Sequence, residues 1–373
     1  MSDVLTPEPA ISSAGSAAAN GSGFLEFEKP LLRIQLDVEA MEREQRETGR
    51  DLSSDIKQQR VRFKTTLKRL YSNLTPWETV QVARHAKRPL ATDYVKSVFR
   101  DFCELHGDRN FSDDRAIVSG FGRIGGHRVM IIGHDKGKDI KQRIACNFGC
   151  AHPEGYRKAL RKMRLAEKYG LPVVCLIDTQ GAYPGVGAEE RGIAFAIATN
   201  LMEISRLRTP IVSVVIGEGG SGGALGIGVA DRVAMFQHAF YSVISPEGCA
   251  AILWKTAERR KHAAEALKLT SRELLKLDLI DHIIPEPVGG AHRDPESAAA
   301  NLERYLIGTL NELKRLGLDS LVAKRQEHIR HLGSFFESPS ELRTQAETRS
   351  PRRSTPRVSR LGQRFAQTQT IPA

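Results

Sequence analysis

Short runs of apolar, β-branched residues alternate with helix-like segments from residue 116 onward, and this alternation restricts the fold more than any other feature. The clearest runs are 171–177 and 210–216, which are rich in Val and Ile and contain no charged residue. Strands of a parallel sheet have this composition because both of their faces are buried, and helices usually connect them. The chain is therefore predicted to form an α/β layered domain with a mostly parallel sheet. Strands are expected near 116–123, 127–133, 172–178, 211–216, 232–236, 241–244 and 279–284, and helices near 154–169, 188–207, 247–257, 261–277 and 296–316.

The region before residue 76 has a different pattern. Apolar side chains recur at helical spacing among dense charges over 31–71, and Gly49 interrupts them, which predicts a helical hairpin. Thr75 and Glu78 have the spacing of a capping box, so a further helix should begin there, with Pro76 at its first position. We divide the chain into a disordered leader (1–23), a helical region (24–75), a larger domain (76–320) and a C-terminal part (321–373) with the end of a helix and a basic, disordered tail.

Composition and charge favour a cytoplasmic protein without membrane or nucleic-acid contacts. The apolar runs are far shorter than the roughly 20 residues that span a membrane, and the first residues lack the basic start and apolar core of a secretory signal. The net charge of +11 suggests nucleic acid, but nearly half of the excess lies in residues 338–373, which contain seven Arg and two Glu. A segment of this composition cannot bury a core, so we interpret it as a solvated tail.

The five cysteines do not predict a metal site. Their odd number and scattered positions suit a reducing compartment. Cys146, Cys150 and His152 could contribute ligands, but no CxxC pair exists to complete a four-ligand zinc site. Buried structural thiols are therefore the favoured interpretation, and no metal is expected in this chain.

Residues 211–230 predict a buried strand, a turn almost without side chains, and then a helix of small residues. Six of the ten residues from Gly217 to Gly226 are glycine. At the start of a helix the backbone N–H groups are unpaired and lie at the positive end of the helix dipole, so they suit a phosphate, a carboxylate or an oxyanion. We place the chemistry of the chain at the turn from Gly217 to Gly223.

Two possible functions of this turn need no nucleophilic side chain: a dinucleotide-binding site and an oxyanion hole. Gly217, Gly219 and Gly222 satisfy GxGxxG, but the motif follows several strands, and Asp231 comes only nine residues after Gly222 instead of about 20. The dinucleotide site is therefore disfavoured. An oxyanion hole made of main-chain N–H groups requires glycines and needs no reactive side chain.

The turn also matches the nucleophile elbow of serine hydrolases. Gly219, Ser221 and Gly223 satisfy GxSxG between a strand and a helix. Ser221 would then need a histidine as its base, and the sequence does not single one out. The candidates are His238, His262, His282 and His292.

Five segments together closely resemble the carboxyltransferase alpha subunit of bacterial acetyl-CoA carboxylase: 153–160, 177–192, 215–228, 241–254 and 283–296. The resemblance implies a crotonase-like fold, a spiral of ββα units, for the domain 76–320. It implies transfer of the carboxyl group from carboxybiotin, held on the biotin carboxyl carrier protein, to acetyl-CoA. The product is malonyl-CoA, in the first committed step of fatty-acid biosynthesis. The implied partners are a carboxyltransferase beta subunit, in an alpha2beta2 assembly, and biotin carboxylase.

The resemblance also implies the site residues. The backbone N–H groups of Gly222 and Gly223 would form the oxyanion hole for biotin, and the beta subunit would serve acetyl-CoA. Further residues expected near the substrate are Gly219, Gly220, Ser221, Tyr183, Gly185 and Arg191. One departure is Gln180, which stands where the family usually has proline. Four basic residues could attract CoA phosphates, although a solvated face is favoured for them: Lys136, Lys138, Arg157 and Lys158.

Overall fold

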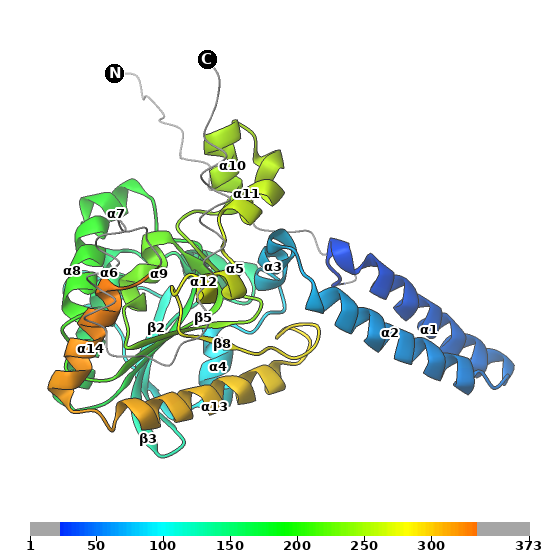
Figure 1. Ribbon diagram of the computed structural model, residues 1–373, viewed down its shortest axis with the longest axis horizontal. Helices are drawn as coiled ribbons and strands as arrows, with labels where there is room; N and C mark the ends of the chain where they lie inside the picture. The colour runs from blue at the N-terminus through cyan, green and yellow to red at the C-terminus, as the bar shows by residue number, and fades with distance from the viewer. Residues whose placement is uncertain (1–22, 334–373) are drawn as a thin grey trace, which may run out of the picture. The chain divides into compact units, whose positions relative to one another are not determined.

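The computed structural model describes residues 23–333, which begin with a pair of long helices (blue in Figure 1). A short 3₁₀ turn, η1 (Glu26–Glu28), precedes α1 (Lys29–Thr48) and α2 (Ser53–Ser72). Gly49 ends α1 with a φ of 69°, a conformation that glycine adopts without strain. The predicted hairpin and its interruption at Gly49 are confirmed.

The capping box predicted after the hairpin is present. Helix α3 (Pro76–Ala83) begins after Thr75, whose Oγ1 accepts a hydrogen bond from the Glu78 N–H at 3.2 Å. Glu78 Oε2 in turn accepts from the Thr75 N–H at 2.8 Å. Two free backbone donors are satisfied in this way, so the chain turns into a new helix where the sequence indicated.

An eight-stranded sheet forms the centre of the fold, in the order β1-β2-β3-β4-β5-β6-β8, with β7 beside the end of β5. The first three strands are antiparallel, and every other pairing is parallel, as predicted for most of the sheet. The strands are β1 (Arg100–Glu104), β2 (Ile117–Ile124), β3 (His127–His134), β4 (Val173–Thr179), β5 (Ile211–Gly220), β6 (Arg232–Phe236), β7 (Phe240–Ser242) and β8 (His282–Ile284).

Helices cover both faces of this sheet. Gly133 and His134 are successive residues of β3, so they point to opposite faces. A Cβ atom at Gly133 would lie 2.9 Å from Ala91 of α4 (Ala91–Val98), whereas Ile117, which pairs with His134, lies against Gly155 of α6 (Pro153–Lys168). Helices α4 and α6 therefore pack on opposite faces.

The remaining helices are α5 (Ile140–Ala145), α7 (Val186–Glu190), α8 (Ile193–Ile204), α9 (Ser221–Gly228), α10 (Pro246–Trp254), α11 (Arg260–Ala266), α12 (Ser271–Lys276), α13 (Pro295–Leu313) and α14 (Leu318–Arg330), with the 3₁₀ turns η2 (Asn147–Gly149) and η3 (Ala257–Arg259). Two predictions of single helices were wrong. The helix expected at 188–207 is divided at Gly192, which has a φ of 77°. The helix expected at 261–277 is divided near Lys268, whose φ of 53° cannot continue a right-handed helix.

A buried ion pair attaches α14 to the sheet. Arg325 contacts both carboxylate oxygens of Asp231, at 2.9 and 2.8 Å, and also donates to the carbonyl oxygens of Ile204, Leu207 and Thr209. The boundary expected at residue 320 falls inside this helix. The basic tail, and the leader up to residue 22, lie outside the described residues. Within 23–333, every helix is too short or too polar to cross a bilayer.

Candidate functional site

The glycine-rich turn joins the end of β5 to the start of α9, and two of its glycines are required by close backbone contacts. A Cβ atom at Gly220 would lie 2.1 Å from the carbonyl oxygen of Gln180. A Cβ atom at Gly223 would lie 2.3 Å from the carbonyl carbon of Gly181. The loop after β4 therefore lies directly against the turn, which only residues without side chains permit.

Gly222 differs from these two glycines. The nearest atom to a Cβ placed there is Ile197 Cδ1, at 3.7 Å, which is an ordinary contact distance. Its φ also lies outside the left-handed region. Packing of the protein itself therefore does not explain a glycine at position 222, and the open space beside it is available to a ligand.

A cavity of about 520 Å³ opens beside Gly222. The N–H groups of Gly222 and Gly223 belong to the first turn of α9, which has no carbonyl of its own to pair them, and no described residue outside the helix accepts from them. These donors lie at the positive end of the helix and suit an oxyanion. The other walls include Gln180, Gly181, Ala182, Tyr183, Pro184, Glu189, Ile193, Ile197, Ser221, Val243, Ile244 and Ser245.

The structure brings four of the predicted site residues together at this cavity: Gly222, Gly223, Ser221 and Tyr183. The Tyr183 ring packs on the His152 ring, with 4.1 Å between centroids, and forms one wall. Gly219 and Gly220 lie at the buried end of β5, behind the cavity. A Cβ atom at Gly219 would lie 2.8 Å from the Tyr241 ring, so this glycine serves packing.

Gly185 and Arg191 do not line the cavity. Gly185 precedes α7, and a Cβ atom there would lie 2.4 Å from the ring of Tyr183, so it makes room for that side chain. Arg191 donates to Glu154 at 2.9 Å, and its guanidinium lies over the Phe111 ring. Nε and Nη2 of Arg191 are thus used within the protein, and a contact of Arg191 with substrate stays a prediction.

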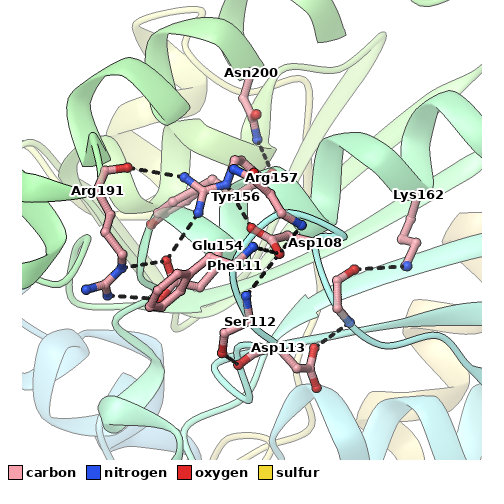
Figure 2. A network of polar contacts seen from close by, with 12 residues as sticks. Asp108, Phe111, Ser112, Asp113, Glu154, Tyr156, Arg157, Lys162, Arg191 and Asn200 are labelled. Carbon is pink, nitrogen blue, oxygen red and sulfur yellow. Dashed lines mark hydrogen bonds and ion pairs between the residues drawn. The ribbon is translucent and has the colours of Figure 1, made fainter.

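Figure 2 shows the polar network to which Arg191 belongs. Arg157 donates to Asp108 at 2.9 Å and to the carbonyl oxygen of Arg191 at 3.2 Å, so α6 is attached to the segment between α7 and α8. The solvated face expected for the basic residues is wrong for Lys158. Its side chain is buried and donates to the Ile117 carbonyl at 2.7 Å.

Sequence reasoning missed a buried cluster of charges directly beneath the turn. Glu218, between Gly217 and Gly219, contacts Lys136 and accepts from Arg84 Nε at 2.6 Å. Lys136 also lies 2.7 Å from Asp178, so it is not on a solvated face either. Burial alone would raise the pKa of Glu218, but Lys136 and Arg84 lower it to about 2. Glu218 is therefore charged at neutral pH.

Arg84 extends this cluster to α10, and the residues just before that helix, Ile244 and Ser245, line the cavity. Its Nη1 donates to Glu247 at 2.7 Å, near the start of α10, while its Nε holds Glu218 in β5. One buried side chain therefore fixes the glycine-rich turn relative to α10. The three residues are far apart in the sequence. Glu218 and Glu247 stand next to glycine or proline, which could have drawn attention to them, but Arg84 has no such neighbour.

The structure does not support a serine hydrolase. Ser221 has a φ of 46°, a strained conformation that a nucleophile elbow would also show. However, the cavity beside it is lined by no histidine among the described residues. The four candidate bases instead pack against other rings. His282 stacks on Tyr305 and His292 on His85, whereas His238 meets Tyr71 edge-on and His262 is tilted against Trp254.

A metal centre is not formed by the part of the chain from 23 to 333, where no three His, Cys, Asp or Glu side chains gather as ligands. Cys146 and Cys150, the cysteines considered above, are free thiols. Burial raises the pKa of both thiols, so they are protonated at neutral pH.

Comparisons with known proteins agree with the sequence resemblance. A family model described as acetyl co-enzyme A carboxylase carboxyltransferase-like matches residues 24–333. The acetyl-coenzyme A carboxylase carboxyl transferase subunit alpha of Rhodopirellula baltica is 53% identical over 313 residues, which are 84% of this chain and 98% of that protein. The subunit of the same name from Burkholderia multivorans is 53% identical over 315 residues, with the same coverage.

A solved structure with a similar chain is the Pseudomonas malonate decarboxylase MdcD-MdcE hetero-dimer. The similarity has a TM-score of 0.49 and 14% sequence identity, over 62% of this chain and 90% of that one. The fold of the present chain is α/β and crotonase-like, as the sequence resemblance implied. From the match over 24–333 and the two relatives, the chain belongs to the family of acetyl-CoA carboxylase carboxyltransferase alpha subunits.

Proposed function

We propose that this chain supplies the biotin half of the carboxyltransferase site, with the N–H groups of Gly222 and Gly223 as its oxyanion hole. The observation that supports this most directly is at Gly222. Its N–H is unpaired, and a side chain at this position would meet only Ile197, inside the cavity. An oxyanion hole needs donors that are free, fixed and accessible, and this position has all three properties.

Carboxybiotin supplies the carboxyl group for transfer to acetyl-CoA, and negative charge develops on its ureido oxygen as that group leaves. The two N–H groups would stabilise this charge. In a site from which water is excluded, each such donor typically contributes a few kcal/mol to lowering the barrier. Tyr183, Ile197 and Ile244 would contact the apolar parts of the ring system, and Ser221 would serve as the residue at which α9 begins.

We propose that the carboxyltransferase beta subunit covers this cavity and binds acetyl-CoA. Four large apolar side chains are exposed on the elements around its mouth: Val186, Phe195, Leu225 and Val243. Phe195 is 78% exposed, and Val243 is 74% exposed. An apolar patch of this kind marks a protein interface more often than a free surface. An alpha2beta2 assembly, contacts with the carrier protein and biotin carboxylase, and a cytoplasmic location are also proposed, from the family resemblance.

The interface can be tested with one pair of variants. Phe195→Glu should weaken assembly with the beta subunit, because it would bury an unpaired charge. Tyr169→Glu is the matched control, since Tyr169 is also exposed but lies before the start of β4, whereas the cavity lies after the end of that strand. Analytical ultracentrifugation of each variant with the beta subunit measures the effect. Equal assembly of both variants would contradict the proposed surface.

Reconstitution tests the reaction itself. The purified chain is mixed with the beta subunit, carboxylated carrier protein and acetyl-CoA, and malonyl-CoA is measured by mass spectrometry. Formation that requires both subunits is expected. A well-folded complex that binds the carrier and makes no malonyl-CoA would overturn the proposal.

A further inference from the structure

Helix α9 has little stability of its own, although the proposed site depends on its first turn. It has eight residues, four of which are glycine. Each glycine in a helix costs roughly 1 kcal/mol relative to alanine, and helices this short are not stable alone. No side chain caps its N-terminus. The position of the Gly222 and Gly223 N–H groups must therefore be fixed by contacts from outside the helix.

Asn200 makes one of these contacts. It lies on α8, is 1% exposed, and its Nδ2 donates to the carbonyl oxygen of Tyr156 at 2.9 Å and to that of Gly226 at 2.8 Å. Both partners can only accept, so the amide must present its nitrogen to them, and its orientation is fixed. One side chain thus joins the second turn of α9 to α6.

Tyr156 makes a second such contact. Its side chain is fully buried, and its hydroxyl donates to the carbonyl oxygen of Gly223 at 3.3 Å. Its ring occupies the space beside Gly226, where a Cβ atom would lie 2.4 Å from the ring. Burial raises the pKa of this phenol far above neutral, so the hydroxyl remains a donor. The backbone of Gly223 is therefore restrained at its carbonyl, next to its free N–H.

We propose that Tyr156 and Asn200 are positioning residues for the carboxyl-transfer reaction, which hold α9 so that the N–H groups of Gly222 and Gly223 converge on the cavity. This inference rests on the proposed function, because it assigns these residues a role through that pair of donors. Neither residue lines the cavity. Each contacts a backbone carbonyl of α9.

The alternative is that both residues only fill the core. Tyr156→Phe separates the two possibilities, since it removes the hydroxyl and keeps the ring that packs on Gly226. Tyr94→Phe is the matched control. Tyr94 is also buried, and its hydroxyl has no hydrogen-bond partner within residues 23–333. Asn200→Ala perturbs α9 more strongly, because it removes two hydrogen bonds. If the Asn200→Ala variant does not fold, Tyr156→Phe still tests the proposal.

Two measurements are made on the complex with the beta subunit. Steady-state malonyl-CoA formation should show kcat lowered roughly tenfold in Tyr156→Phe, with KM for the carboxylated carrier within about twofold, because misplaced donors weaken the transition state more than binding. Hydrogen exchange, followed by mass spectrometry, should show faster exchange in 221–228 for Tyr156→Phe, but not for Tyr94→Phe.

Unchanged exchange in 221–228 would overturn the positioning role whatever the activity. If Tyr156→Phe shows faster hydrogen exchange in 221–228 but keeps the wild-type kcat, the positioning role is overturned as well, because a more mobile α9 would then not affect the reaction. A wild-type complex that makes no malonyl-CoA would instead refute the proposed function. If the wild-type complex is inactive, faster hydrogen exchange in 221–228 of Tyr156→Phe would still show that Tyr156 restrains α9. The role of Tyr156 and Asn200 in carboxyl transfer would nevertheless be overturned.

Discussion

Substitution of Gly222 should change the activity without changing the stability of the fold. Among the glycines from Gly217 to Gly223, it is the one at which an added Cβ atom meets no close neighbour. Gly222→Ala adds a methyl group 3.7 Å from Ile197 Cδ1, so no atom has to move. Removing a helical glycine should leave the fold unchanged or stabilise it by up to about 1 kcal/mol. Gly222→Val would place a larger group in the cavity beside the two N–H donors.

Gly223→Ala should behave in the opposite way. Its Cβ atom would lie 2.3 Å from the carbonyl carbon of Gly181, and ordinary contact begins at 3.4 Å. The loop after β4 would have to move by about 1 Å, and overpacking of this kind costs roughly 1–3 kcal/mol. A lower Tm is therefore expected for this variant along with lower activity, so it cannot test the site by itself.

The assay is malonyl-CoA formation by the complex, with Tm measured on the same samples. Gly222→Val keeps the backbone N–H, but its side chain would occupy the space in front of the donors. Blocked access to one oxyanion donor should lower kcat by about 10²–10³, with an unchanged Tm. Gly308→Val is the matched control, because Gly308 is also helical and a Cβ atom there meets nothing within 4 Å. Transfer by Gly222→Val within about threefold of wild type would refute the oxyanion role.

Three further predictions concern other residues. Ser221→Ala should keep carboxyl transfer within about twofold, because its hydroxyl is not used, whereas a nucleophile would lose nearly all turnover. The pKa of Glu218 is lowered from 4.5 to about 2, despite burial, by the two cations beside it. Its charged form therefore stabilises the fold above pH 4.5 by about 3 kcal/mol, and this contribution is lost as pH falls from 4.5 toward 2. Glu218→Gln should remove this part of the pH dependence in urea unfolding, and an unchanged pH slope would contradict the assignment. Arg325→Met should lower the free energy of unfolding by about 3–5 kcal/mol, because it leaves Asp231 buried and without its counter-charge, while adding Asp231→Leu should restore the part that is due to the unpaired charge. A loss below about 1 kcal/mol in the single variant would show that the pair is not required.

The central strands could be predicted because each is buried on both faces and therefore consists of consecutive apolar residues. The run at 210–216 became β5, which is buried along its whole length. Strand β1 was missed for the opposite reason. It is a mostly exposed edge strand, with only Phe102 half-buried, and has no apolar run. The division at Gly192 was missed because one left-handed residue interrupts a pattern that is otherwise helical on both sides.

The glycine-rich part of the candidate site could be predicted because its residues are neighbours in the sequence, whereas Tyr183 was expected there only from the family resemblance. Gly222 and Gly223 belong to one turn, and glycine content alone indicated an exposed backbone. Tyr156, Asn200 and Arg84 reach the same turn from other elements, and no local pattern distinguishes them from core or surface residues. Arg191 was expected near the substrate, and its pairing with Glu154, 37 residues away, could not be foreseen from the sequence.

The pairing of Asp231 with Arg325 sets an order for folding during synthesis. Asp231 immediately precedes β6, and its counter-charge is added to the growing chain 94 residues later. Until then the carboxylate has to stay in contact with water, because burying it alone costs several kcal/mol. Closing the sheet around β5 and β6 before α14 has emerged from the ribosome would therefore cost several kcal/mol. A nascent chain without α14 should expose this part of the core, and chaperones would find their binding surface there.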